Sequence, residues 1–379
     1  MPRACTAQLR FPNGRFVALL AMYRIGTVLL GSLIPFLAAC SSDEPAAPAA
    51  SGCGPTTPKN APQERIEGAH ASDDPTQVRL CVEGEKLPTE LSNPWDLHCD
   101  IASGLGASVD AAAAPPTRLR ILEWNIKFGT DLPGVIDVLE NHPEAKLADV
   151  LLLVEVDRGC DRSGQVDEAR SLAERWGMDW AFGVEFVEHS QGGCEEGNAV
   201  LSRYPLLNPV HAFHNVGALE RGGLRAPYDW ALDKDEIRTG RRSFIGADIR
   251  FGSSLLHVVS AHLENRSQAQ ERADQLGEIV ALIDGLPRRA ACIAGDFNVF
   301  PDLGVPVPDA PLFELMDKTC FENPHGDMPQ SERRTRPNLN YQIDFTYTRG
   351  VRIADRGVIN ELTNVPSDHF PVWVDIEAK

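Results

Sequence analysis

The sequence predicts an α/β layered domain over residues 117–379. Short apolar runs of strand length recur along this region, and segments with helical periodicity separate some of them. Many strands with only a few intervening helices are typical of a layered α/β domain. Hydrophobic residues make up 43% of the 379-residue chain, so it can bury a large core.

The expected elements follow from these runs. One helix is expected between Val166 and Trp176, with Gly177 as its stop signal. A longer helix from Ser267 to Asp284 has Ser267 and Gln270 in capping-box spacing and one apolar face. The expected strands are Leu119 to Asn125, Val150 to Val156, Asn198 to Ser202, Ser243 to Ile249, Leu255 to His262, Ala290 to Asp296, Tyr341 to Thr348 and Val372 to Ile376.

Residues 1–39 have the features of a secretory signal peptide. They carry four arginines and no acidic residue, and their apolar run from Ile25 to Phe36 is too short to span a membrane. The following Leu-Ala-Ala-Cys40 resembles a bacterial lipobox, so we expect Cys40 to be acylated and to anchor the protein in the cell envelope, at the outer membrane or cell surface. Met22, which begins a compact version of this signal, is the expected true start. The alternative is an ordinary buried helix that ends at a chance cysteine.

The region between the signal and the main domain divides in two. Residues 40–62 are rich in Ala, Pro and Ser, which predicts a disordered tether. Residues 63–116 carry too few apolar positions for an independent core and end in an Ala-Pro linker, so we expect a small appendage and linker there. Within the main domain, the segment from His211 to Thr239 is expected to be a surface insertion, with a substrate lid as the alternative.

Cysteine positions suggest disulfides, because an exported protein meets an oxidising environment. Cys160 and Cys194 lie in polar, glycine-bearing loops, and we hypothesise that they pair. A Cys81–Cys99 disulfide is a second hypothesis. Cys292 lies inside an apolar run and is expected to be a buried thiol.

Polar or charged residues end nearly every expected strand of the main domain, where hydrophobic patterning does not predict them. Each one alone is more often a satisfied structural group than a catalyst, but together they form an ordered set. These residues are Asn125, Glu155, His262, Asp296 with Asn298, Asp344, and Asp368 with His369.

The order and local contexts of this set resemble the endonuclease/exonuclease/phosphatase superfamily, which has the deoxyribonuclease-I-like fold. The resemblance covers about residues 118–377, and its specific motifs are Gly-Asp296-Phe-Asn298 and Ser-Asp368-His369. It implies a four-layered α/β sandwich, in which two mixed β-sheets pack face to face with helices on the outer faces. It also implies metal-dependent cleavage of a phosphoester.

The residue types also suit this chemistry on physical grounds. A phosphodiester must lose negative charge before a nucleophile approaches, and a hard divalent cation held by oxygen ligands supplies this effect. Mg²⁺ is the expected cofactor, with Mn²⁺ as an alternative. Glu155 is the best ligand candidate, and Asn125 and Asp368 are expected to assist.

His369 and Asp344 are expected to form a His-carboxylate pair that takes a proton from water. Asp296 and Asn298 would orient the attacking water and the phosphate. His262 would donate to a nonbridging oxygen or to the leaving group.

Arginines complete the expected site. Arg242, or its neighbour Arg241, falls where the resemblance implies a contact with phosphate. Arg333, Arg334 and Arg336 cluster near the end of the domain, where they would either touch an anionic substrate or belong to a solvated loop.

The net charge of the chain argues against one class of function, the tight nonspecific binding of nucleic acid. Lys and Arg total 36 against 54 Asp and Glu, a formal charge of −18, which has the wrong sign for tight nonspecific binding of nucleic acid. The leading hypothesis is a monomeric, lipid-anchored, Mg²⁺-dependent phosphodiesterase or phosphomonoesterase that works outside the cytoplasm. The alternatives are an extracellular or periplasmic nuclease and a non-catalytic surface binding lipoprotein. The substrate remains open among lipid headgroups, small molecules and nucleic acid.

Overall fold

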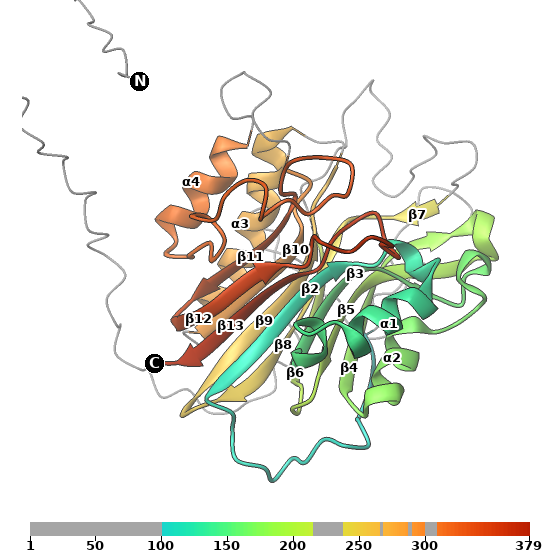
Figure 1. Cartoon of the computed structure of the whole chain (residues 1–379), viewed down its shortest axis with the longest axis horizontal. Helices are drawn as coiled ribbons and strands as arrows, with labels where there is room; N and C mark the ends of the chain where they lie inside the picture. Colours follow the sequence, from blue (N-terminus) through green and yellow to red (C-terminus); the bar gives the residue numbers. More distant parts are fainter. Residues whose placement is uncertain (1–100, 215–237, 266–267, 287–289, 300–308) are drawn as a thin grey trace, which may run out of the picture. The chain divides into compact units, whose positions relative to one another are not determined.

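The computed structural model describes residues 101–214, 238–265, 268–286, 290–299 and 309–379 (Figure 1). The expected signal peptide, Cys40 and the tether lie outside the described residues, as does most of the 63–116 region with the Cys81–Cys99 pair. The greater part of the expected insertion, residues 215–237, also lies outside them.

Two mixed β-sheets form the centre of the domain. The larger sheet has the order β1-β4-β5-β3-β2-β13-β12, with the short β7 paired to β4, and its β2–β3 pair is parallel. Its strands are β1 (Ile101–Gly104), β2 (Arg118–Asn125), β3 (Val150–Arg158), β4 (Asp179–Glu188), β5 (Cys194–Ser202), β7 (Arg238–Gly240), β12 (Val351–Val358) and β13 (Val372–Ala378).

The smaller sheet has the order β11-β10-β9-β8-β6, and its β9–β10 pair is parallel. Its strands are β6 (Leu207–Phe213), β8 (Ser243–Phe251), β9 (Ser254–His262), β10 (Ala290–Asp296) and β11 (Asp344–Arg349). In both sheets the parallel pair lies inside the sheet, flanked by antiparallel strands.

Helices cover the outer faces of the sheets, which gives the expected four-layered sandwich (Figure 1). The helices α1 (Leu132–Asn141) and α2 (Glu168–Trp176) pack on the larger sheet, and α3 (Ala269–Gly285) and α4 (Ala310–Lys318) pack on the smaller one. A third apolar cluster lies between the sheets and includes Ile121, Leu152, Val258 and Ala294. Strands β3 and β10, one from each parallel pair, are therefore buried on both faces, which is why their sequences are mostly apolar.

All eight expected strands are present, with ends shifted by a few residues. Both expected helices are also present. Gly177 ends α2 in the left-handed conformation, with φ of 63°. The expected cap, Ser267, lies outside the described residues. The capping box of α3 is formed by Gln268 and Glu271, and the Gln268 backbone N–H donates to the Glu271 side chain.

Part of the region expected to be an appendage and linker belongs to the larger sheet. Strand β1 pairs with β4 and adds an edge strand from the region expected to be an appendage and linker. The sequence did not indicate β1 because it has only four residues and no apolar alternation. Strands β4, β6, β7 and β12 and helices α1 and α4 were likewise not expected.

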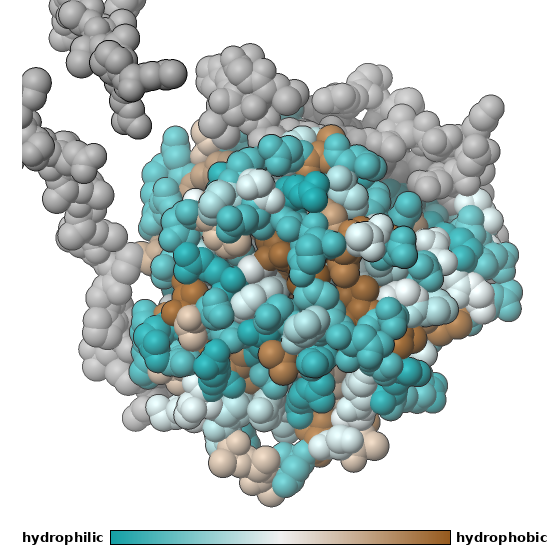
Figure 2. Space-filling model, in the orientation of Figure 1, coloured by the Kyte–Doolittle hydropathy of each residue, from teal (hydrophilic) through white to brown (hydrophobic). Residues whose placement is uncertain are grey.

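The surface is mainly hydrophilic on the face shown in Figure 2, with apolar areas between the polar ones. Large exposed apolar side chains among the described residues are Leu105, Leu147 and Leu339. Within the described part of the chain, no helix has both the length and the apolar character needed to cross a bilayer.

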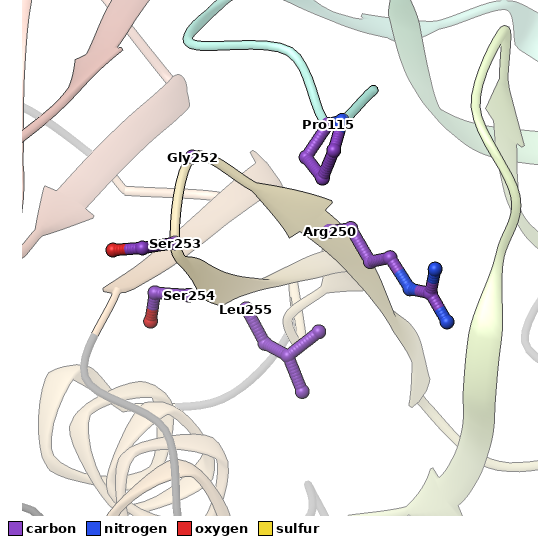
Figure 3. A pocket seen from close by; sticks show the side chains of 6 residues that line it. All are labelled: Pro115, Arg250, Gly252, Ser253, Ser254 and Leu255. Atoms are coloured by element: carbon purple, nitrogen blue, oxygen red, sulfur yellow. The ribbon is translucent and has the colours of Figure 1, made fainter. Parts of the chain in front are cut away.

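A shallow pocket lies at the β8–β9 turn, at the opposite end of β9 from His262 (Figure 3). Its lining residues are Pro115, Arg250, Gly252, Ser253, Ser254 and Leu255. None of them is a candidate catalytic or metal-binding residue, so this pocket is separate from the expected site.

A disulfide joins Cys160, at the end of the β3 segment, to Cys194, at the start of β5. This is the pairing that the loop positions suggested. Cys292 is a free, buried thiol, as expected. The disulfide ties together two antiparallel strands beside the edge of the sheet at which β3 ends.

We predict that replacing Cys160 and Cys194 together by alanine lowers the free energy of unfolding by about 2–4 kcal/mol, because the bond constrains the unfolded chain. The measurement is denaturant unfolding without reductant. Each single variant should lose as much as the double variant, since either change removes the same bond. A non-reducing peptide map that shows both cysteines as free thiols would contradict the pairing.

Candidate functional site

Strand register places three of the expected residues side by side in the smaller sheet. Asp296, the last residue of β10, pairs with His262 of β9 on one side and with Asp344 of β11 on the other. Gly295 permits this close approach, because a Cβ atom there would lie 1.7 Å from the carbonyl oxygen of Ala261. The glycine before the aspartate is thus required by the backbone of the neighbouring strand.

The larger sheet brings Asn125 and Glu155 to the same region. Asn125 ends β2, and its side-chain amide donates to Asp296 Oδ2 over 3.3 Å, which links the two sheets. Glu155 lies at an irregularity of β3 and has a positive φ of 53°, a strained conformation for a residue other than glycine. The irregularity interrupts the strand alternation at the residue expected to bind a metal.

His369 and Asp344 form the expected pair. His369 Nδ1 lies 2.8 and 2.9 Å from the two carboxylate oxygens of Asp344, and both residues are buried. The Trp124 indole donates to the His369 carbonyl oxygen, and the Thr335 hydroxyl accepts from the Asp344 backbone N–H. Ser367 donates to the Asn125 carbonyl oxygen and accepts from the His369 N–H. These contacts hold both members of the pair in place.

The protonation of His369 depends on the groups that face its two ring nitrogens, Asp344 at Nδ1 and Arg336 at Nε2. Burial lowers its pKa, but the charges of Asp344 and Asp296 outweigh burial and raise the pKa to about 9. On the other side, Arg336 Nη1 lies 2.9 Å from His369 Nε2. A guanidinium can only donate, and two cationic donors cannot share a contact of this length, so Nε2 is unprotonated in this arrangement. The contact and the raised pKa therefore favour different states: with Arg336 on Nε2 the ring carries one proton, on Nδ1 facing Asp344, whereas the charges of Asp344 and Asp296 favour a second proton.

His262 has a different set of partners. Arg242 donates to His262 Nδ1 over 2.7 Å and to the Glu185 carboxylate, and Glu185 lies 3.3 Å from the same nitrogen. Because Arg242 donates to Nδ1, the His262 proton lies on Nε2, which is 3.8 Å from Asp296 and 4.0 Å from Glu155. The pKa of Glu185 is lowered, since Arg242 and His262 outweigh the effect of burial.

The structure therefore gives Arg242 a role other than the expected phosphate contact. The residue is 4% exposed and lies behind His262, where it binds Glu185. Arg241, the alternative, donates to the His214 carbonyl oxygen. The sequence suggested an arginine in this region but could not show that a buried glutamate would hold it.

Asn298 and Asp368 lie at the edges of this arrangement. The Asn298 backbone N–H donates to Asp296 Oδ1, and its side-chain amide donates to the Leu263 carbonyl oxygen, so Asn298 braces the turn after β10. Asp368 Oδ2 accepts from Arg336 over 2.8 Å. Its side chain is 37% exposed, the most open of the candidate ligands for which an exposure is known.

Two buried glutamates are functional candidates that the sequence analysis missed. Glu185 lies in β4, and its position within the apolar run Trp180 to Val187 was the available signal. Glu123 lies two residues before Asn125, and neither of its oxygens has a hydrogen-bond partner among the residues that the structure describes. Burial, with the charges of Asp344 and Asp296, raises the pKa of Glu123 well above its usual range.

Two clusters of side chains have the spacing of metal ligands, and their partners distinguish them. In Glu185, Glu196 and His262, Arg242 already binds Glu185, and Arg238 binds Glu196 over 3.2 Å, so this cluster does not fit a cation. Asp296, Asp344 and His369 form the other cluster.

Glu155 lies near His262, whose Nε2 is also 3.8 Å from Asp296 of the second cluster. Among the described residues, its nearest cationic partner is His262 Nε2 at 4.0 Å. An unpaired carboxylate together with the Asn125 amide oxygen and further carboxylates is a donor set that suits a hard divalent cation.

Comparisons with known proteins agree with this arrangement. Residues 122–369 match the family model described as Endonuclease/Exonuclease/phosphatase family. No curated protein matches the sequence significantly.

Solved structures give the same fold. An endonuclease/exonuclease/phosphatase protein from Beutenbergia cavernae is 18% identical with a TM-score of 0.52, over 69% of this chain and 72% of that chain. One from Bacteroides vulgatus is 16% identical with a TM-score of 0.50, over 69% of this chain and 100% of that chain. The family model spans well over half of the sequence, from β2 to His369. The chain therefore belongs to the endonuclease/exonuclease/phosphatase family.

Proposed function

We propose that this chain is a divalent-metal-dependent phosphoesterase that hydrolyses a phosphodiester or a phosphomonoester outside the cytoplasm. The buried His369–Asp344 pair is the observation that carries the proposal, together with Glu155, whose nearest cationic partner among the described residues is His262 at 4.0 Å. The family consists of hydrolases that act on phosphoesters, which supports it.

The residues of the site have separate tasks in this reaction. His369 Nε2 accepts a proton from water while the water oxygen forms a bond to phosphorus and the bond to the leaving oxygen breaks. Asp344 holds the ring orientation and stabilises the imidazolium that forms. Asp296 orients the water, together with Asn298. His262 donates from Nε2 to a nonbridging oxygen, because Arg242 fixes the proton on that nitrogen.

Glu155, Asn125 and Asp368 would hold the cation, Mg²⁺ or Mn²⁺. A bound cation neutralises charge on the phosphoryl oxygens as a Lewis acid. The oxygen donors of these residues and the lack of an ion-pair partner closer than 4.0 Å for Glu155 within the described residues support this assignment.

Two other functions are weighed against this one. A nuclease would share the whole site, but a formal charge of −18 gives no long-range attraction to a polyanion. A non-catalytic binding protein would have no physical need for this set of buried carboxylates around two imidazoles, because burying charge costs free energy. We therefore place the phosphoesterase first and the nuclease second.

The test is an assay of the purified mature protein with Mg²⁺ and with EDTA against plasmid DNA, RNA, bis-p-nitrophenyl phosphate, sphingomyelin and inositol phosphates. The proposal requires Mg²⁺-dependent hydrolysis of at least one of these esters. Hydrolysis of plasmid DNA or RNA alone would favour the nuclease. Turnover that EDTA does not diminish would remove the metal-dependent mechanism.

We predict that His369→Ala and Asp344→Asn each lower kcat by a factor of ~10² to 10⁴ and leave KM almost unchanged, because the pair acts on water in the transition state. The double variant should be little worse than the poorer single variant, since the two residues act as one unit. Steady-state kinetics measures both parameters, and an unchanged unfolding midpoint checks the fold. Losses that multiply in the double variant, or a His369→Ala enzyme within a factor of about two of the wild type, would contradict this role.

A second prediction concerns Glu155. Glu155→Gln should lose most of the Mg²⁺-dependent activity, because the amide keeps the size of the side chain but removes the charge that attracts a hard cation. The matched control is Glu174→Gln, which removes the same charge from an exposed ion pair with Arg170 on α2. Titration of activity with Mg²⁺ makes the comparison. Equal activity of the two variants at limiting Mg²⁺ would exclude Glu155 as a ligand.

We also propose that the protein is anchored in the cell envelope through acylated Cys40, because Leu-Ala-Ala-Cys40 follows the apolar run of the signal. The prediction is that the protein from its native bacterium enters the detergent phase of a Triton X-114 separation and that a Cys40→Ala variant does not. Partition of the unaltered protein into the aqueous phase would refute the anchor.

A further inference from the structure

Arg336 bridges two residues of the site from a loop that the proposed mechanism does not use. One nitrogen of its guanidinium donates to His369 Nε2 over 2.9 Å, and the other donates to Asp368 Oδ2 over 2.8 Å. If His369 is the base, its Nε2 has to meet water, and Nε2 is the atom that Arg336 contacts.

Both ring nitrogens of His369 are therefore occupied in this arrangement. Nδ1 faces Asp344, and the lone pair of Nε2 is taken by Arg336. Since a guanidinium has no acceptor, it cannot pass a proton to the ring or relay one from water. Water reaches Nε2 only when the Arg336 side chain has another position.

The loop around Arg336 has a backbone held by hydrogen bonds and an arginine side chain that is partly exposed. Thr335 is buried, its hydroxyl accepts from the N–H groups of Ile343 and Asp344, and its carbonyl oxygen accepts from the N–H of Phe370. In contrast, the side chains of Arg336 and Asp368 are 31% and 37% exposed. An ion pair this open to solvent is weak and exchanges partners easily.

The neighbouring arginines do not share this position. Arg333 donates to the Gly326 carbonyl oxygen and the Gln330 side chain, and Arg334 donates to the carbonyl oxygens of Pro337 and Asn360. Both hold the loop together. Of the three arginines, Arg336 is the one whose partners are site residues.

We propose that Arg336 binds the phosphoryl group of the substrate and that this change of partner uncovers His369 Nε2 for the attacking water. The proposal rests on the phosphoesterase function proposed above. A phosphoryl group presents paired oxygens that match the planar fork of a guanidinium. It also carries negative charge, so it can replace Asp368 as the anionic partner of Arg336. The base would then be free only when a phosphoester occupies the site.

Inorganic phosphate is the probe, and calorimetric titration of the full mature protein in Mg²⁺ buffer measures its binding. Arg336→Ala should weaken phosphate binding by about 10- to 100-fold, the effect of losing a charge-assisted hydrogen bond. It should raise KM for the best ester of the panel by a similar factor and change kcat less. Arg336→Lys should recover only part of the affinity, since it keeps the charge and loses the fork. Arg333→Ala, which removes the same charge from the same loop, is the control and should bind phosphate as the wild type does.

Two outcomes would overturn the role of Arg336. The first is equal phosphate affinity in Arg336→Ala and Arg333→Ala. The second is a changed Mg²⁺ concentration for half-maximal activity with unchanged phosphate affinity, which would make Arg336 a partner of Asp368 alone. Because phosphate binding is measured without turnover, it decides on Arg336 even if the wild type hydrolyses no ester of the panel. That last result would instead count against the phosphoesterase.

Discussion

The contact between His369 Nδ1 and the Asp344 carboxylate is the interaction on which the rest of the site depends. Asp344 begins β11 in the smaller sheet, whereas His369 lies just before β13 of the larger sheet. The pair therefore forms only when the two sheets are packed together. The Trp124 indole donates to the His369 carbonyl oxygen, and the Thr335 hydroxyl accepts from the Asp344 backbone N–H. These two bonds hold the backbone positions from which the paired side chains meet. Assembly of the proposed base therefore requires the packed sandwich.

Buried carboxylates surround this pair, and each has a different neighbour. Glu185 has Arg242 and His262, Asp344 has His369, Glu123 has no partner, and Glu155 has no cation nearer than 4.0 Å within the described residues. The partners set the charge of each group. Arginine and histidine neighbours lower the pKa of Glu185, burial raises the pKa of Glu123, and the partly exposed Glu155 suits a cation. One sheet edge can therefore hold residues for metal binding and for proton transfer.

The sequence predicts candidate site residues where the signal is local. A polar residue at the end of an apolar strand is visible without the fold, and the structure brings Asn125, His262 and Asp296, predicted in this way, within reach of one another. Glu185 was missed because the alternation of β4 was not recognised, and the role of Arg242 depends on Glu185, which lies 57 positions away. The edge strands β1 and β7 are too short to show a period. Features that arise from contacts between distant segments, such as Arg336 on His369, need the structure.

If His369 is the base, the water that it activates attacks phosphorus. Isotope labelling tests this role of His369 most directly. The measurement is hydrolysis of bis-p-nitrophenyl phosphate by the mature protein with Mg²⁺ in ¹⁸O-labelled water, followed by mass spectrometry of both products. Attack at phosphorus places one labelled oxygen in p-nitrophenyl phosphate and none in p-nitrophenol, at a rate that falls when His369 is replaced by alanine. Label in p-nitrophenol would contradict attack at phosphorus. Labelled p-nitrophenyl phosphate formed equally fast by the His369→Ala enzyme would contradict the role of His369 as the base.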